Sequence, residues 1–101
     1  MDPDLSDQIH ISDVVVSTAG RDQGAWFYVI SEEPNFLMLA NGKDRTLDKP
    51  KRKKRKHVQK VLRSETRVAE KIRSGNKVLN SELRRDLAFH ANQMQANNLG
   101  G

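Results

Sequence analysis

The chain has no cysteine, which excludes disulfide bonds and thiolate metal sites and fits a reducing compartment. No run of apolar residues approaches the ~20 that a helix needs to span a bilayer. The acidic start, residues 1–7, lacks the basic and then apolar order of a secretory signal. We therefore expect a cytoplasmic protein that does not enter a membrane.

The chain is also short and poor in groups that build catalytic or metal sites. A chain of 101 residues has room for one domain and buries only about two-thirds of its unfolded surface, so a deep cleft is not expected. The three histidines, His10, His57 and His90, have no ligand-like spacing. Spacing supports no carboxylate pair and no Ser-His-Asp set. The sequence therefore predicts no catalytic residue, no metal site and no cofactor.

Charge is abundant and unevenly placed. The net charge is +5, yet residues 1–40 carry seven acids and one base, while residues 41–60 carry ten bases and two acids. Such a block of positive charge is a local electrostatic footprint that indicates an anionic partner.

Three short segments of the first half have the composition of β-strands. Residues 14–16 are all valine, residues 26–30 combine aromatic and β-branched side chains, and residues 36–40 are largely apolar. A glycine-flanked loop at residues 19–24 and a turn containing Pro34 separate them.

A hairpin is expected to follow these strands. Asn41-Gly42 supplies the two positive-φ positions of a type I′ turn, with residues 43–47 as the returning strand. Four or five short strands joined by tight turns favour a small closed barrel, since closure removes exposed edges. We therefore predict a mainly β fold with an α appendage. The barrel occupies residues 9–48, after a flexible acidic segment at residues 1–8.

The second half is expected to form three further parts. Residues 49–60 are a basic tract whose six consecutive bases, residues 51–56, repel one another and have no apolar face. This composition predicts an extended and mobile segment. Two helices follow within residues 61–95, and residues 96–101 form a disordered tail.

Local signals place the ends of the two helices. We expect Ser64 to cap the first helix and Ser74-Gly75 to end it. The second helix begins near Asn80-Ser81.

Several segments resemble a known family. Residues 14–29, a strand, a glycine-containing basic loop and a second strand, resemble a KOW motif. Residues 41–57 and the helix start at residues 80–84 are similar to small bacterial KOW-domain RNA-binding proteins. These in turn resemble the fourteen-type large-subunit ribosomal protein of archaea and eukaryotes. Two positions depart from the pattern, because Asn41 stands where Asp is expected and Gln23 where Lys is common.

The resemblance covers nearly everything from about residue 9 to residue 90. It implies an SH3-like barrel that binds ribosomal RNA of the large subunit or takes part in its assembly, with no catalytic residues. It carries RNA-facing positions over to the glycine loop and to the basic tract. These positions are Ser17, Gly20, Arg21 and Gly24 in the loop, and Lys49, Lys51, Arg52, Lys53, Lys54, Arg55, Lys56 and His57 in the tract.

The basic residues point to RNA in their own right. Lysine and arginine that neutralise phosphates release counterions, and such contacts carry no direct sequence information. Lys43 and Arg45 extend the basic region, but they lie on opposite faces of the expected strand, so only one should reach RNA with the tract. A solvated linker or a nuclear-import-like address has similar composition and remains an alternative.

The glycine loop and the aromatic strand are further candidates. Arg21 can pair with a phosphate or stack on a base, and glycines let the backbone approach the RNA chain. The alternative is an ordinary turn in which Asp22 caps its own backbone. Trp26 and Tyr28 share one side of their strand and either stack on bases or are covered by the core or by an appended helix.

Two other functions fit parts of the sequence. An SH3-like module can dock a protein, here through the helical stripe of Val68, Ile72, Leu83 and Leu87. A polybasic segment can also tether a protein to an anionic membrane, but no lipidation signal or amphipathic anchor adjoins the tract. We therefore expect a monomer with RNA as its main partner, a protein as the alternative partner at the helices, and no membrane partner.

Overall fold

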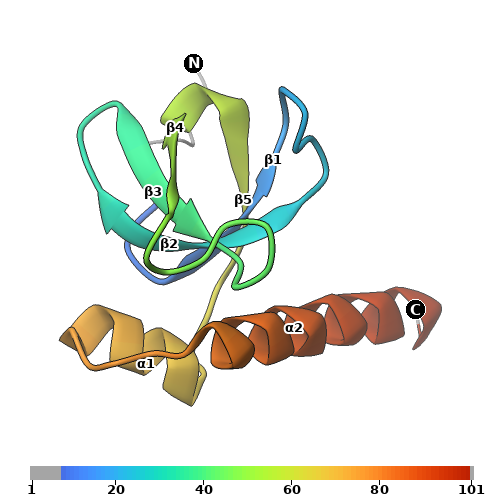
Figure 1. The fold of residues 1–101 in the computed structure, drawn as a ribbon. Coiled ribbons are helices and arrows are strands. Elements are labelled where there is room, and N and C mark those ends of the chain that lie inside the picture. Colours follow the sequence, from blue (N-terminus) through green and yellow to red (C-terminus); the bar gives the residue numbers. More distant parts are fainter. Residues whose placement is uncertain (1–7, 101) are drawn as a thin grey trace.

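A computed structural model describes residues 8–100 (Figure 1), with side chains over residues 8–95. Five antiparallel strands form one sheet in the order β4-β3-β2-β1-β5. The strands are β1 Asp13–Ser17, β2 Trp26–Glu32, β3 Phe36–Ala40, β4 Lys51–Lys54 and β5 Val58–Arg63, and the helices are α1 Arg67–Ser74 and α2 Asn80–Gly100. The predicted mainly β fold with a helical appendage is confirmed.

The sheet is not closed, so the predicted closed barrel is wrong on this point. β4 and β5 are its two edges, and no strand pairing within residues 8–100 joins them. A single 3₁₀ turn, Arg55–His57 (η2), leads the chain from one edge to the other. This turn is held by two backbone hydrogen bonds, from Arg55 N to Asn35 O at 3.0 Å and from Thr18 N to His57 O at 2.9 Å.

Alternate residues of the strands build a core on the concave side of the sheet. Phe27 and Val29 of β2 face this side, as period-two geometry requires. Each such buried side chain contributes about 1.5–3 kcal/mol relative to an exposed one. The cluster comprises Ile9, Val15, Phe27, Val29, Leu37, Leu39 and Val58.

The opposite face of the sheet is covered by the two helices, which lie together beneath it in Figure 1. Val14, Tyr28 and Ala40 of the sheet pack there against Ala69, Leu83 and Leu87 of the helices. Residues 26–30 of β2 are covered on both faces, and this part of its sequence is continuously apolar and aromatic.

This packing settles two expectations about side chains. Tyr28 is 0% exposed and Trp26 packs partly buried in the same cluster, so the aromatic pair lies beneath the helices. The helical stripe predicted to dock a partner also belongs to this cluster, which turns it toward the sheet. Its members are Val68, Ile72, Leu83 and Leu87.

The helix ends are close to their predicted positions. α1 ends at Gly75, whose φ of 74° is the left-handed conformation of a helix C-cap. Its N-cap is Thr66, with Oγ1 accepting from Ala69 N at 3.2 Å, and not Ser64 as predicted. Ser64 is buried and bonded to the Tyr28 hydroxyl. α2 begins at Asn80 as predicted.

The two chain ends compare differently with expectation. α2 continues through residues 96–100, which were predicted to be disordered. The predicted flexible segment, residues 1–8, lies outside the described residues except for Gln8. Neither helix of the described chain is long and apolar enough to cross a bilayer.

The basic tract is the largest departure from expectation. The predicted mobile segment at residues 49–60 instead supplies β4, η2 and the first half of β5. The predicted strand at residues 43–47 is a loop. A boundary at residue 48 therefore does not separate a barrel from a tail, because strands on both sides of it share one sheet. The physical reason lies in the partners of the tract's alternate side chains.

Candidate nucleic-acid interface

The cations of the basic tract fall into two sets, one turned toward the protein and one toward solvent, along β4 and through the 3₁₀ turn η2. Side chains alternate between the faces of an extended chain. Lys51 is half-buried and Lys53 and Arg55 are buried, whereas the residues between and after them are exposed. The exposed set is Arg52, Lys54 and Lys56.

The buried side chain of Lys53 is held by polar groups of the loop between β1 and β2. This side chain is 7% exposed, and Nζ lies 2.7 Å from both Asp22 Oδ1 and Ala19 O. Lys51 Nζ pairs with the other oxygen of Asp22 at 2.8 Å. Partial burial alone would raise the pKa of the Asp22 carboxyl. Hydrogen bonds from Lys51, Lys53 and Ser17 outweigh that effect and hold the pKa well below its usual range.

Arg55 has a similar structural role at the other end of the tract. It is 8% exposed. Nη1 donates to Ile9 O at 2.9 Å, and Nε donates to Glu33 O at 2.9 Å. Nη2 lies 3.5 Å from Glu32 Oε1. The inward cations therefore satisfy carbonyl and carboxylate oxygens of the first half of the chain, and this pairing orders the tract without RNA.

The outward cations remain available to a ligand. Arg52 lies over the Phe36 ring, with Cζ 3.7 Å from its centre, and pairs with half-buried Glu33 at 3.1 Å. The pKa of Glu33 is lowered by its hydrogen bond to Arg52. Lys54 and Lys56 are exposed, and their side chains make no ion pair within the described residues. Exposed pairs such as Arg52–Glu33 contribute little to stability, so exchange with a phosphate costs little.

The loop between β1 and β2 takes a fixed shape, in which the Asp22 side chain pairs with Ser17, Lys51 and Lys53. Gly20 and Gly24 have φ of 88° and 90°, which only glycine adopts without strain. Ser17 is 1% exposed, and its hydroxyl donates to Ala19 O and Asp22 Oδ1. Ser17, a predicted RNA-facing residue, is therefore a buried support of the loop. Arg21 is exposed at its tip.

The loop between β3 and β4 carries three more exposed cations. Asn41 Oδ1 accepts from Lys43 N at 2.9 Å and from Arg45 N at 3.1 Å, which closes a compact turn. Because this segment is not a strand, the expectation that Lys43 and Arg45 face opposite sides does not apply. Both are exposed, as is Lys49, and His57 is half-buried.

The start of α2 fixes this second loop in place. Asn80 Oδ1 accepts from Leu47 N at 2.8 Å, and Arg84 Nη1 donates to Gly42 O. Gly42 is buried, with φ of 78°. A Cβ built on Gly42 would lie 2.2 Å from Asn80 O, so no larger residue fits.

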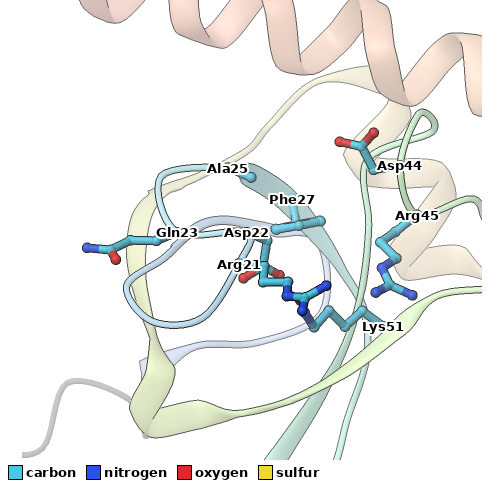
Figure 2. Close-up of a pocket in the computed structure, with 8 residues that line it drawn as sticks. All are labelled: Arg21, Asp22, Gln23, Ala25, Phe27, Asp44, Arg45 and Lys51. Carbon is cyan, nitrogen blue, oxygen red and sulfur yellow. Dashed lines mark ion pairs between the residues drawn. The ribbon is translucent and has the colours of Figure 1, made fainter.

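The two loops and β4 enclose an open hollow of about 410 Å³ (Figure 2). Figure 2 shows Lys51 extending from β4 toward Asp22 and Arg21, with Arg45 on the other side of the hollow. The hollow is lined by Arg21, Asp22, Gln23, Ala25, Phe27, Asp44, Arg45 and Lys51. Cations far apart in sequence therefore meet at one place, which sequence reasoning did not detect.

A buried polar cluster lies on the other face of the sheet, beneath the helices. His90 Nε2 lies 2.9 Å from Ser64 Oγ and 3.5 Å from Asp86 Oδ2. A Ser-His-Asp triad needs the serine and the carboxylate on different ring nitrogens, and an accessible serine. Here both contact the same nitrogen and Ser64 is 0% exposed, so this cluster lacks that geometry.

The same cluster includes the Tyr28 hydroxyl. The Tyr28 hydroxyl donates to Asp86. Burial is the main cause that raises the pKa of Tyr28 far above its usual value, and the neighbouring Asp86 carboxylate raises it further. The cluster thus joins β2 to α2. Nothing in the sequence pattern indicated it, since its members are scattered over 62 positions.

Comparisons with models of known protein families and with curated proteins gave no match for this chain. Within the part of the chain that the structure describes, no three His, Asp or Glu residues gather in a group that could hold a metal ion.

Proposed function

We propose that the protein is a cytoplasmic RNA-binding protein and not an enzyme. Its binding surface comprises the outward cations of the tract, the cations of the two loops, and half-buried Lys51, which lines the hollow between the loops. The observation that carries this proposal is the division of the tract, in which every second base is held by the protein while the others remain exposed. The binding residues are Arg21, Lys43, Arg45, Lys49, Lys51, Arg52, Lys54 and Lys56, with Gly20 and Gly24 shaping the first loop.

The electrostatics favour a polyanion as the ligand. Exposed cations on ordered backbone lose less conformational entropy on binding than cations on a mobile tail. Each phosphate contact releases counterions, so affinity falls with salt at a log–log slope of about −0.7 to −0.9 per contact. Because the contacts are mainly to phosphate, they position the protein and carry little sequence information.

The arrangement of strands supports the KOW resemblance in one respect. The glycine loop joins the adjacent antiparallel strands β1 and β2, as that motif requires. On this basis we extend the proposal to an SH3-like domain of the KOW type whose RNA is ribosomal RNA of the large subunit or of its assembly intermediates.

Sedimentation of cell extract on sucrose gradients tests the proposed partner. We expect the protein to migrate with large-subunit particles at low salt, and to move to the top of the gradient at high salt or after nuclease treatment. Migration at the top under all conditions contradicts a ribosomal partner. Migration with particles that is insensitive to both salt and nuclease contradicts RNA binding through phosphate contacts.

A protein partner at the helices is the second candidate. The stripe first assigned to it is covered by the sheet, so the candidate now rests on exposed apolar side chains elsewhere on the helical side. These are Leu79 at 51% exposure, Phe89 at 49% and Met94 at 38%. Nuclease-insensitive sedimentation with a protein complex would favour this function over RNA binding.

A further inference from the structure

The hollow between the two loops is chemically mixed, which separates it from a simple phosphate site. Arg21, Arg45 and Lys51 line it together with the carboxylate of Asp44. A carboxylate repels phosphate, but it accepts hydrogen bonds from the N–H groups that bases carry on their edges. The cations of the hollow therefore attract phosphate, whereas Asp44 repels phosphate and can accept hydrogen bonds from a base edge.

One part of the wall of the hollow is apolar, and in another part Lys51 is held in place by an ion pair with Asp22. Half-buried Ala25 contributes carbon surface against which a base can rest, while Phe27 behind it is 1% exposed and belongs to the core. Lys51 is held by Asp22 at 2.8 Å, and an ammonium with three donors can serve a ligand while keeping that pair. The volume of about 410 Å³ lies within the range of small-ligand sites.

We propose that this hollow binds a single unpaired nucleotide of the RNA. The base enters between the two loops, with its edge toward Asp44 and its face toward Ala25, while Arg21 and Arg45 hold the flanking phosphates. This inference rests on the proposed RNA binding and narrows its target to RNA with a bulged or single-stranded nucleotide, the form in which base edges are accessible. A fully paired duplex satisfies the phosphate contacts and leaves the hollow empty.

Three hairpin RNAs of the same stem sequence test the inference. One is fully paired, one has a single-nucleotide bulge, and one has the same bulge without its base. Fluorescence anisotropy at one fixed salt concentration gives the three dissociation constants. We expect the bulged RNA to bind roughly tenfold more tightly than the abasic RNA, since a hydrogen bond from the base edge to the charged Asp44 carboxylate adds affinity of that order. The abasic and paired RNAs should bind alike.

Two variants separate the hollow from general charge. Asp44→Ala removes the acceptor for the base edge and should reduce the preference for the bulged over the abasic RNA to about twofold or less, without weakening the abasic and paired RNAs. Lys56→Gln removes a charge outside the hollow and should weaken all three RNAs by a similar factor while keeping the preference. Both side chains are exposed, so the fold is retained.

The outcomes distinguish this inference from the proposed function. If all three RNAs bind equally and lose affinity with salt, RNA binding stands and the nucleotide site is refuted. If Asp44→Ala and Lys56→Gln affect the preference equally, the hollow is not its source. If none of the RNAs binds, both proposals fall.

Discussion

Replacing Arg55 with methionine is expected to lower the free energy of unfolding by about 3 kcal/mol, although the residue lies in a run of bases that resembles a solvated tail. Methionine keeps the apolar stem but leaves the carbonyl oxygens of Ile9 and Glu33 without their buried donor. Each buried group left unsatisfied costs about 1–3 kcal/mol. Urea unfolding followed by circular dichroism measures the difference.

Neighbouring cations of the same tract provide the matched controls. Lys54→Met and Lys56→Met remove the same charge from exposed positions, so each should change stability by no more than about 0.5 kcal/mol. Equal losses for the inward and outward variants would show that the two sets of cations do not differ in structural role.

Gly42→Ala is expected to destabilise the protein by about 2–5 kcal/mol. A left-handed conformation costs a residue with a Cβ about 1–2 kcal/mol. At Gly42 the added Cβ would also lie 2.2 Å from Asn80 O, so the loop or the start of α2 must shift. Overpacking of this kind costs about 1–3 kcal/mol more. Thermal and urea unfolding would measure the loss.

Gly75→Ala is the control for the conformational part of that cost. Its φ of 74° is close to the 78° of Gly42, but no atom lies within 4 Å of an added Cβ. We expect a loss of about 1–2 kcal/mol, from backbone strain alone. If the two alanine variants lose the same stability, the packing of the second loop against α2 contributes nothing.

Much of the fold follows from local sequence. Residues 14–16, 26–30 and 36–40 lie in β1, β2 and β3 because β-branched and aromatic side chains fit a sheet buried on both faces. The end of α1 at Gly75 and the start of α2 at Asn80 were also predictable from capping preferences.

The basic strand could not be predicted in this way. Local reasoning considers the repulsion among residues 51–56, whereas the groups that hold Lys53 and Arg55 lie 22 to 46 residues earlier in sequence. A run of uniform charge also hides the period of two that reveals a strand. The available signal was the segregation of acids into residues 1–40, which indicates that counterions for the tract lie there. In the structure these counterions include Asp22 and Glu32.

The candidate site was predicted only in its composition. Ser17, Lys53 and Arg55 were assigned to RNA because they belong to the right segments, yet burial gives them structural roles. The hollow depends on the β3–β4 loop, whose position is set by Asn80 of α2. A hairpin at Asn41-Gly42 is locally favoured, but contacts with α2 select a longer loop. Because Lys53 and Arg55 are buried supports of the fold, substituting the entire tract would not separate loss of folding from loss of binding.

The central claim is that the exposed half of the tract binds RNA, and the affinity of two charge-matched double variants tests it most directly. Lys54→Gln with Lys56→Gln removes two outward cations of the tract, and Arg67→Gln with Arg85→Gln removes two exposed cations from the helical side. Dissociation constants for one RNA are measured across a salt series.

We expect the tract variant to bind at least several-fold more weakly and its log–log salt slope to become shallower by about 1.4–1.8, as two lost phosphate contacts require. The helical variant should keep the affinity and the slope of the unmodified protein. Equal effects of the two variants, or an effect of the helical variant alone, would contradict the account.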